Sequence, residues 1–250
     1  MLELKGLTKH FGGVRAVERV DLTVRQGEIL GLIGPNGSGK STIVNLICGL
    51  FPPTDGRVLL RGEDISALPP HARVGLGVAR TFQNIRLFGQ LTVWQNLWVA
   101  QNASAQAGEE SFLRRWLGGA RRARAGIDRT LEFFDLAHKR DELAANLAFG
   151  EQRRLEFARA LAARPALMLL DEPAAGMNAE EIGELDGRIR ALRNEGVTIL
   201  LIEHHVELVM SVTDRIAVLN FGQKIAEGTP AQVQADPLVR EAYLGTATAA

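Results

Sequence analysis

Short apolar runs rich in β-branched residues recur along the chain and alternate with stretches that have helical periodicity. The runs predicted as strands are residues 17–24, 29–33, 78–82, 167–170, 197–202 and 216–219. The clearest helical stretches are residues 180–194 and 237–244. Strands that alternate with helices in this way indicate an α/β fold built on a largely parallel sheet.

Two regions depart from this alternation. Near the N-terminus the strands are closely spaced, with turns predicted at Gly12-Gly13 and Gly56, which favours an antiparallel β subdomain. From about residue 91 to 163 the strand signals vanish and Leu, Ala, Arg and Glu dominate. We therefore predict a helical subdomain inserted into one domain that spans residues 1–250.

Composition adds few constraints. The 250 residues are 46% hydrophobic and 23% charged, as in globular proteins with a large core, and the 29 basic side chains balance the 29 acidic ones. No overall field therefore favours nucleic acid as a partner. The single cysteine, Cys48, is expected to be a buried structural thiol. The N-terminus does not resemble a secretory signal and no apolar run approaches ~20 residues, so we expect a cytoplasmic protein.

The sequence GPNGSGKST at residues 34–42 has the pattern of a phosphate-binding loop. An apolar strand precedes it and a helical pattern follows it, which is the context that this motif requires. We predict that backbone amides of the loop bind the phosphates of a nucleoside triphosphate, that Lys40 adds a positive charge, and that the Ser41 hydroxyl ligates Mg²⁺. The predicted nucleotide-binding residues of this loop are Gly34, Pro35, Asn36, Gly37, Ser38, Gly39, Lys40, Ser41 and Thr42.

Two carboxylates end the apolar run at residues 167–170. In an open α/β sheet, acidic residues at the carboxyl end of a strand lie beside the phosphate loop. We predict that Asp171 binds Mg²⁺ and that Glu172 orients or deprotonates the attacking water.

Glu203, His204 and His205 follow another predicted strand. His204 could contact the terminal phosphate or position water, and the two histidines could equally be ordinary surface residues. Because neighbouring side chains on a strand point in opposite directions, a metal site formed jointly by His204 and His205 is disfavoured.

Together with Gln83, the segment LAFGEQRR (147–154) and LLDEP (169–173), these motifs resemble an ATP-binding-cassette subunit over essentially the whole chain. The resemblance implies a P-loop NTPase core of the RecA-like type, with an antiparallel β subdomain and a helical subdomain. It also implies two subunits that enclose two ATP molecules. By resemblance, Phe11 stacks on adenine, Gln83 contacts Mg²⁺ or water, His204 assists hydrolysis, and residues 174–178 face the opposite site.

The signature motif departs from the usual LSGGQ. Here the nucleotide-contacting residues implied by the resemblance are Ala148, Phe149, Gly150 and Glu151. Ala148 lacks a hydroxyl that would donate a hydrogen bond of roughly 1.5–3 kcal/mol to a phosphate. The backbone amides near Gly150 and the start of the following helix remain available, so we expect a functional signature with weaker anchoring.

This signature and the segments LLDEPAAGMN and LLIEHHVELVM resemble the ATPases of branched-chain amino-acid importers. The resemblance implies two transmembrane permease subunits, a second ATPase in a heterodimer or a homodimer, and a substrate-binding protein, on the inner face of the membrane. His205 stands where this family usually has Asp. A urea, amide or lipid-linked substrate, or a soluble non-transport role, remains an alternative.

Residues 112–126 resemble an extra segment of these importers. Their arginines, at positions 114, 115, 121, 122 and 124, leave lipid or nucleic-acid binding open, but a solvated helix face is the favoured interpretation.

Overall fold

The computed structural model describes residues 1–81, 85–103 and 120–244 of the chain. It divides into two compact units, one formed by Met1–Pro70 with Leu169–Ala250 and the other by His71–Met168. Gln83 and the predicted segment 112–126, apart from its last residues, lie outside the described part. Of the five arginines in that segment, only Arg124 has a described side chain, and it is exposed.

The first unit contains most of the strands. Its strands are β1 (Leu2–Phe11), β2 (Val14–Val24), β3 (Ile29–Ile33), β4 (Asp55–Leu60), β5 (Glu63–Asp64), β8 (Thr198–Ile202), β9 (Arg215–Asn220) and β10 (Gln223–Gly228). Its helices are α1 (Lys40–Ile47), α7 (Ala179–Asn194), α8 (Val206–Val212), α9 (Pro230–Ala235) and α10 (Pro237–Leu244). The boundary between the units falls within β7 (Leu167–Asp171).

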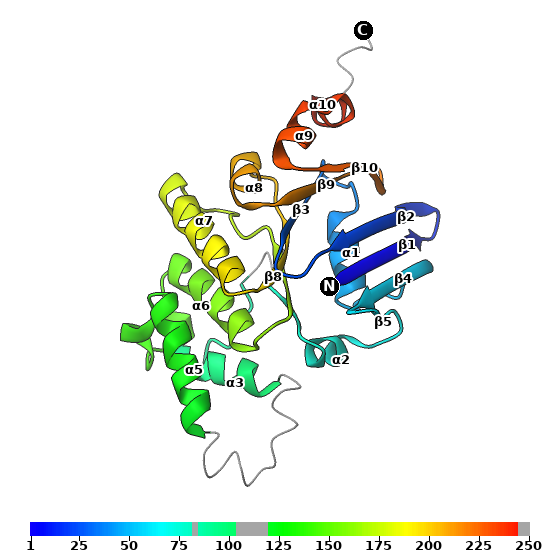
Figure 1. The fold of residues 1–250 in the computed structure, drawn as a ribbon. Coiled ribbons are helices and arrows are strands. Elements are labelled where there is room, and N and C mark those ends of the chain that lie inside the picture. The colour runs from blue at the N-terminus through cyan, green and yellow to red at the C-terminus, as the bar shows by residue number, and fades with distance from the viewer. Residues whose placement is uncertain (82–84, 104–119, 245–250) are drawn as a thin grey trace. The chain divides into compact units, whose positions relative to one another are not determined.

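An antiparallel sheet with strand order β2-β1-β4-β5 confirms the antiparallel N-terminal region (Figure 1). The predicted turn at Gly12-Gly13 joins β1 to β2. The prediction of a turn at Gly56 is wrong, because this residue lies inside β4. There its φ is 80°, and a Cβ atom would come within 2.3 Å of the Gly6 carbonyl oxygen. The glycine therefore serves a close approach of two backbones where the β1–β4 register is irregular.

The main sheet of this unit runs β10-β9-β3-β8-β7, and β3 pairs in parallel with both β8 and β9. Every residue of β3, β7 and β8 is buried, which explains why these strands appear in the sequence as continuous apolar runs. The predicted α/β fold with a largely parallel sheet is therefore confirmed. Parallel pairing also places the carboxyl ends of β3 and β8 at one edge.

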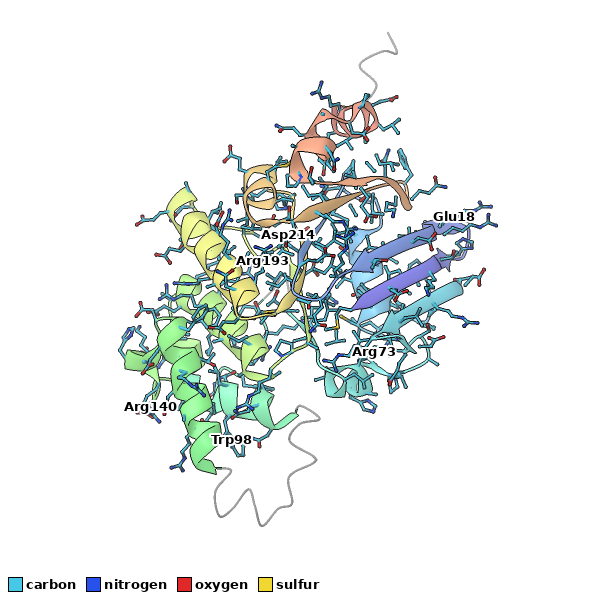
Figure 2. All side chains as sticks on the ribbon, in the orientation of Figure 1. Glu18, Arg73, Trp98, Arg140, Arg193 and Asp214 are labelled. Atoms are coloured by element: carbon cyan, nitrogen blue, oxygen red, sulfur yellow. The ribbon has the colours of Figure 1, made fainter. Side chains whose placement is uncertain are left out.

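Helices α7 and α10 start where the sequence predicted them, to within one residue. Asn178 caps α7 by accepting a hydrogen bond from the Glu181 amide, and the Glu181 side chain accepts one from the Asn178 amide. Near its other end, α7 is tied to the start of β9, because Arg193 and Asp214 point toward each other and form an ion pair (Figure 2).

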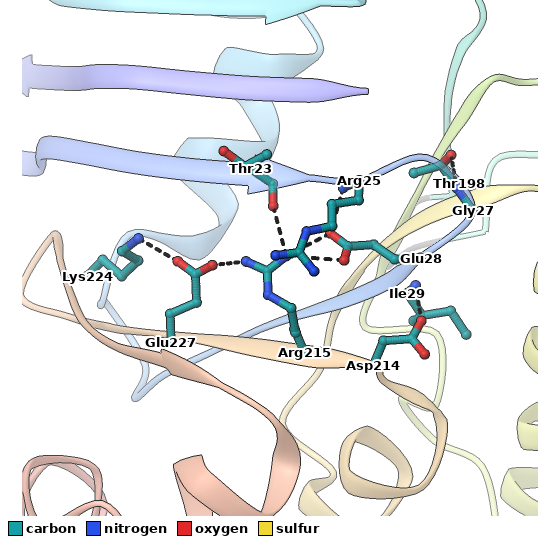
Figure 3. A network of polar contacts seen from close by, with 10 residues as sticks. All are labelled: Thr23, Arg25, Gly27, Glu28, Ile29, Thr198, Asp214, Arg215, Lys224 and Glu227. Carbon is teal, nitrogen blue, oxygen red and sulfur yellow. Dashed lines mark hydrogen bonds and ion pairs between the residues drawn. The ribbon is translucent and has the colours of Figure 1, made fainter.

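A polar network joins the strands β3, β9 and β10 (Figure 3). Arg215 donates to both carboxylate oxygens of Glu28, at 3.0 and 3.1 Å, and also pairs with Glu227. The Arg25 amide donates to Glu28 as well, at 2.6 Å. Because the Glu28 side chain is only 9% exposed, its charge depends on Arg215 for compensation.

We expect Arg215→Met to destabilise the protein by about 3 kcal/mol, because it leaves the buried carboxylate of Glu28 without its cation. The free energy of unfolding in urea measures this loss. Arg57→Met is the control, since Arg57 lies 3.8 Å from Asp64 at a largely exposed site and such pairs contribute about 1 kcal/mol or less. Equal effects of the two substitutions would contradict the structural role of the network.

The second unit is mainly helical. It contains α2 (Pro70–Gly75, with its first residue in the other unit), β6 (Val78–Arg80), α3 (Val93–Ala103), α5 (Ala120–Phe133), η3 (Ala137–Lys139), η4 (Ala144–Asn146) and α6 (Phe149–Ala162). Helices α3, α5 and α6 pack on one another around buried residues such as Leu97, Leu131 and Phe157. None of the helices in the described part of the chain is long and apolar enough to span a membrane.

Candidate nucleotide-binding site

The phosphate-loop sequence follows β3 and leads into α1, as predicted, although the helix already begins at Lys40, within the motif. Two of its glycines are required by the geometry. A Cβ atom at Gly34 would lie 2.2 Å from the Leu219 carbonyl oxygen, and one at Gly39 would lie 2.5 Å from that of Ala16. The φ angles at these glycines, 151° and 105°, are in the region that side chains disfavour. The loop therefore follows a path that only glycine permits.

Lys40 lies within this loop and is 7% exposed. Its Nζ donates to the carbonyl oxygens of Gly34, at 2.7 Å, and Pro35, at 3.0 Å. Burial lowers the pKa of Lys40, while the negative charges of Glu172 and Asp171 act in the opposite direction. The charges of both predicted acidic residues therefore favour the protonated form of Lys40.

A pocket of about 370 Å³ opens over the loop. Its lining residues are Val14, Arg15, Ala16, Asn36, Gly37, Ser38, Gly39, Lys40, Ser41, Thr42, Glu172 and Phe221. The structure therefore brings Glu172 together with the phosphate loop. Asp171, 6% exposed at the end of β7, lies next to Glu172 in sequence.

The loop fits a chain of phosphate groups. The N-cap of α1 is Gly39, a residue without a side chain that could cap the helix, so the first amides of α1 are available to an anion. Within the described residues, the buried Ser38 hydroxyl oxygen has no hydrogen-bond partner. The closely spaced glycines, amide donors and Lys40 together form a cradle for negatively charged oxygen atoms.

A Mg²⁺ ion that is bound together with phosphate groups needs few ligands from the protein. Among the described residues, no group of three or more His, Cys, Asp or Glu side chains is placed to hold a metal ion. Ser41, at the exposed start of α1, and the carboxylate of Asp171 are the described candidates. The third, Gln83, is outside the described residues.

The pocket lining includes residues that the sequence did not single out: Val14, Arg15, Ala16 and Phe221. They come from the start of β2 and from the turn after β9, whose approach to the loop depends on the tertiary fold. For Phe221 the sequence offered one signal, its position directly after β9, the strand that pairs with β3. Phe11 is not among the described residues that line this pocket. It is 42% exposed, and its ring makes an edge contact with Phe51 at 5.3 Å.

If Phe11 stacks on adenine, Phe11→Ala should weaken ATP binding about fivefold, which corresponds to ~1 kcal/mol of lost base stacking. Titration of a fluorescent ATP analogue measures the dissociation constant. Phe221→Ala, measured in parallel, removes the 87%-exposed aromatic ring that lines the pocket. A larger loss in that variant would assign the stacking role to Phe221.

His204 and His205 follow β8 rather than belonging to it, so the strand-based prediction that they point apart is wrong. Their ring centroids lie 5.0 Å apart, with the planes tilted by 36°. His205 occupies the N-cap position of α8, and the turn into this helix brings the rings close. The His204 side chain is 54% exposed. It is therefore accessible to a substrate or a partner.

The signature segment belongs to the second unit. Helix α6 begins at Phe149, inside the signature motif, with Ala148 at its N-cap. Glu151 accepts hydrogen bonds from the Ala148 amide at 2.9 Å and from Lys139 at 3.0 Å. Burial acts to raise the pKa of Glu151, but the hydrogen bonds from Lys139 and Ala148 outweigh it and the pKa is lowered. Phe149 is 57% exposed beside Gly150.

Cys48 is only half-buried, contrary to the prediction of a buried thiol. It lies at the C-cap of α1, one residue beyond the last helical position.

Comparison with known proteins places these features in a family. The profile described as "ABC transporter" matches residues 17–175, and the profile described as "Branched-chain amino acid ATP-binding cassette transporter" matches residues 223–249. A crystal structure of the ADP conformation of an ATP-binding cassette of an ABC transporter superposes with a TM-score of 0.84. It is 32% identical in sequence, and 98% of each chain is covered.

The high-affinity branched-chain amino acid transport ATP-binding protein LivG of Escherichia coli (strain K12) is 45% identical over 99% of this chain and 98% of its own length. The corresponding protein BraF of Pseudomonas aeruginosa is 44% identical over the same shares. The lipopolysaccharide export system ATP-binding protein LptB of Haemophilus influenzae is 38% identical over 98% of this chain and 97% of its own length. The chain belongs to the ABC transporter family, as the phosphate loop, the pocket above it and these full-length similarities show.

Proposed function

We propose that this chain is the ATP-hydrolysing subunit of an ABC importer for branched-chain amino acids. The observation that carries the proposal is the 45% identity to LivG over 99% of the chain, together with the branched-chain profile at residues 223–249. The substrate is inferred from these relatives alone, because the permease and binding protein, rather than this subunit, contact it.

The phosphate loop would bind the β- and γ-phosphates of ATP through its backbone amides and the start of α1. Lys40 would exchange its hydrogen bonds to the Gly34 and Pro35 carbonyls for charge-assisted bonds to phosphate oxygens. Phe11 would stack on the adenine. Within the phosphate loop, the buried hydroxyl of Ser38 would supply a further hydrogen-bond donor to the phosphates.

Ser41, Asp171 and Gln83 are the residues that would hold Mg²⁺, which when bound neutralises negative charge on the phosphate oxygens. Glu172 lines the same pocket as the phosphate loop, and it would take a proton from the attacking water. His204 is exposed two residues after the end of β8, and it would contact the terminal phosphate or position the attacking water.

A second ATPase subunit would complete the site of this chain with its own signature motif, and residues Ala148, Phe149, Gly150 and Glu151 of this chain would complete the site of that partner. The relatives support a dimeric arrangement, since one solved cassette that is 25% identical is described as dimeric and bound to ADP and Pi. We favour a heterodimer with a related ATPase, associated with two permease subunits on the inner face of the membrane. A substrate-binding protein would deliver the amino acid.

We expect Ala148→Ser to tighten ATP-driven dimerisation by about tenfold, because the new hydroxyl can donate to the partner's γ-phosphate. Analytical ultracentrifugation with Glu172→Gln in the background, to slow hydrolysis, measures the dimer dissociation constant. An unchanged constant would mean that backbone amides already satisfy that phosphate.

The substrate assignment is tested by deleting the gene and measuring uptake of labelled leucine, isoleucine, valine and urea. Leucine uptake should be lost, and should return with the wild-type gene but not with the gene encoding Glu172→Gln. Loss of urea uptake with normal leucine uptake would overturn the proposed substrate.

The 38% identity to LptB favours one second candidate, an ATPase that powers export of a lipid-linked cargo. Purification of the chain with its membrane partners separates the two functions. Permease subunits of an amino-acid importer support the first, whereas export subunits would support the second.

A further inference from the structure

Glu203 is a fully buried carboxylate that lies between two functional loops, with an exposed fraction of 0%. It follows β8 directly and precedes His204. One oxygen, Oε1, accepts a hydrogen bond from the Ala174 amide at 2.7 Å. The other, Oε2, accepts from the amides of His204, at 2.7 Å, and His205, at 3.1 Å. A single side chain thus bonds to the backbone of both loops.

The loop that ends at Ala174 begins with Glu172, whose backbone conformation is unusual. Its φ is 49°, in the left-handed region that residues with a side chain rarely adopt, and a proline follows it. Such a conformation persists only where surrounding contacts fix it. Two contacts from the neighbouring strand do so, because the Glu172 amide donates to the Ile202 carbonyl at 2.8 Å and the Ala174 amide donates to Glu203.

The same carboxylate also fixes the turn that carries His204. Two consecutive amides point at Oε2, and His204 Nδ1 lies 3.5 Å from that oxygen. Because a carboxylate offers acceptors on both oxygens, it can bond to the two loops at once. A displacement of either loop would therefore strain the hydrogen bonds that Glu203 makes to the other loop.

We propose that Glu203 is a positioning residue for ATP hydrolysis, which holds Glu172 and His204 in a fixed relation by bonding to the backbone of both loops. The inference rests on the proposed function of those two residues in hydrolysis. Because its carboxylate is buried and bonded to backbone amides, Glu203 would act on hydrolysis through the two loops.

Glu203→Gln tests the hydrogen bonds of Glu203 while it keeps the size of the buried side chain. The amide has nearly the same shape, but its NH₂ group cannot accept a hydrogen bond. Whichever way the amide is oriented, one loop loses its acceptor. We expect kcat for ATP hydrolysis to fall about tenfold, as expected for the loss of one buried hydrogen bond, while the dissociation constant for ATP stays within about twofold.

The matched control is Glu207→Gln, which makes the same chemical change at an exposed position in the first turn of α8. It should leave kcat unchanged. If the wild-type chain and this control hydrolyse ATP and Glu203→Gln does so equally fast, the positioning role is overturned. If the wild-type dimer does not hydrolyse ATP, the proposed function fails instead.

A double-mutant cycle distinguishes positioning from general support of the fold. With His204→Ala, the combined loss of kcat should be smaller than the product of the single losses by about threefold or more, because both substitutions act through one loop. If the combined loss of kcat equals the product of the two single losses, the proposal is overturned. A parallel loss of ATP affinity and thermal stability in Glu203→Gln would overturn it as well.

Hydrogen exchange of the unaltered chain gives a test that does not depend on a variant that folds. The amides of Ala174 and His204 should exchange more slowly than the amide of Gly62, in the exposed turn between β4 and β5. Equally fast exchange at these positions would show that Glu203 does not hold the loops.

Discussion

Replacing Lys40 with alanine is expected to weaken ATP binding at least ~100-fold, or about 2.7 kcal/mol, because it removes the charged donor of the phosphate loop. In the structure this ammonium group is buried and donates to two carbonyl oxygens of the loop. Its burial lowers the pKa of Lys40, and the carboxylates of Glu172 and Asp171 partly restore it. The cation is therefore held inside the phosphate loop.

Isothermal titration of the purified chain with ATP measures the loss. Lys40→Met provides a second variant that keeps the aliphatic packing and removes only the charge. Both variants should bind ATP equally poorly. Binding of ATP by Lys40→Met with wild-type affinity would contradict the assigned phosphate contact.

The second large effect is expected for Glu172→Gln, which should slow hydrolysis about 100-fold or more while ATP still binds. Glutamine has the same shape but cannot accept a proton from water at neutral pH. Because Glu172 lines the pocket, its replacement acts at the phosphate loop itself. ATP should then accumulate bound, and the closed dimer should persist.

Steady-state release of phosphate and size-exclusion chromatography with ATP measure the two expectations. Glu195→Gln, at the exposed C-cap of α7, is a control of equal chemistry that should hydrolyse ATP normally. Normal turnover in Glu172→Gln would rule out this residue as the proton acceptor.

Much of the main sheet and the phosphate loop could be predicted from sequence, because both leave local signals. The buried strands β3 and β8 appear as unbroken apolar runs, and the loop has a spacing of glycines that its backbone path requires. The start of α10 was also predictable, since a proline marks it. In each case, neighbouring residues alone determine the local structure.

Other features depend on residues that are distant in the sequence. The bounds of strand β1 were not predicted, because its buried positions, Leu2, Leu4 and Leu7, do not alternate regularly and its register with β2 shifts. Glu203 appeared only as part of a polar triplet, since its burial and its bond to Ala174 arise from tertiary contacts. Phe221 reaches the pocket for the same reason.

The N-cap of α6 has a consequence for engineering a heat-resistant form of the chain. Ala148 has the extended backbone conformation typical of an N-cap, with φ −61° and ψ 157°, but it has no side-chain oxygen to accept from the first turn. Glu151 already provides the reciprocal bond, at 2.9 Å. A hydroxyl at position 148 would complete the capping pair and add about 1 kcal/mol to the stability of each subunit. One oxygen atom would then raise the melting temperature of the isolated subunit as well as its tendency to associate.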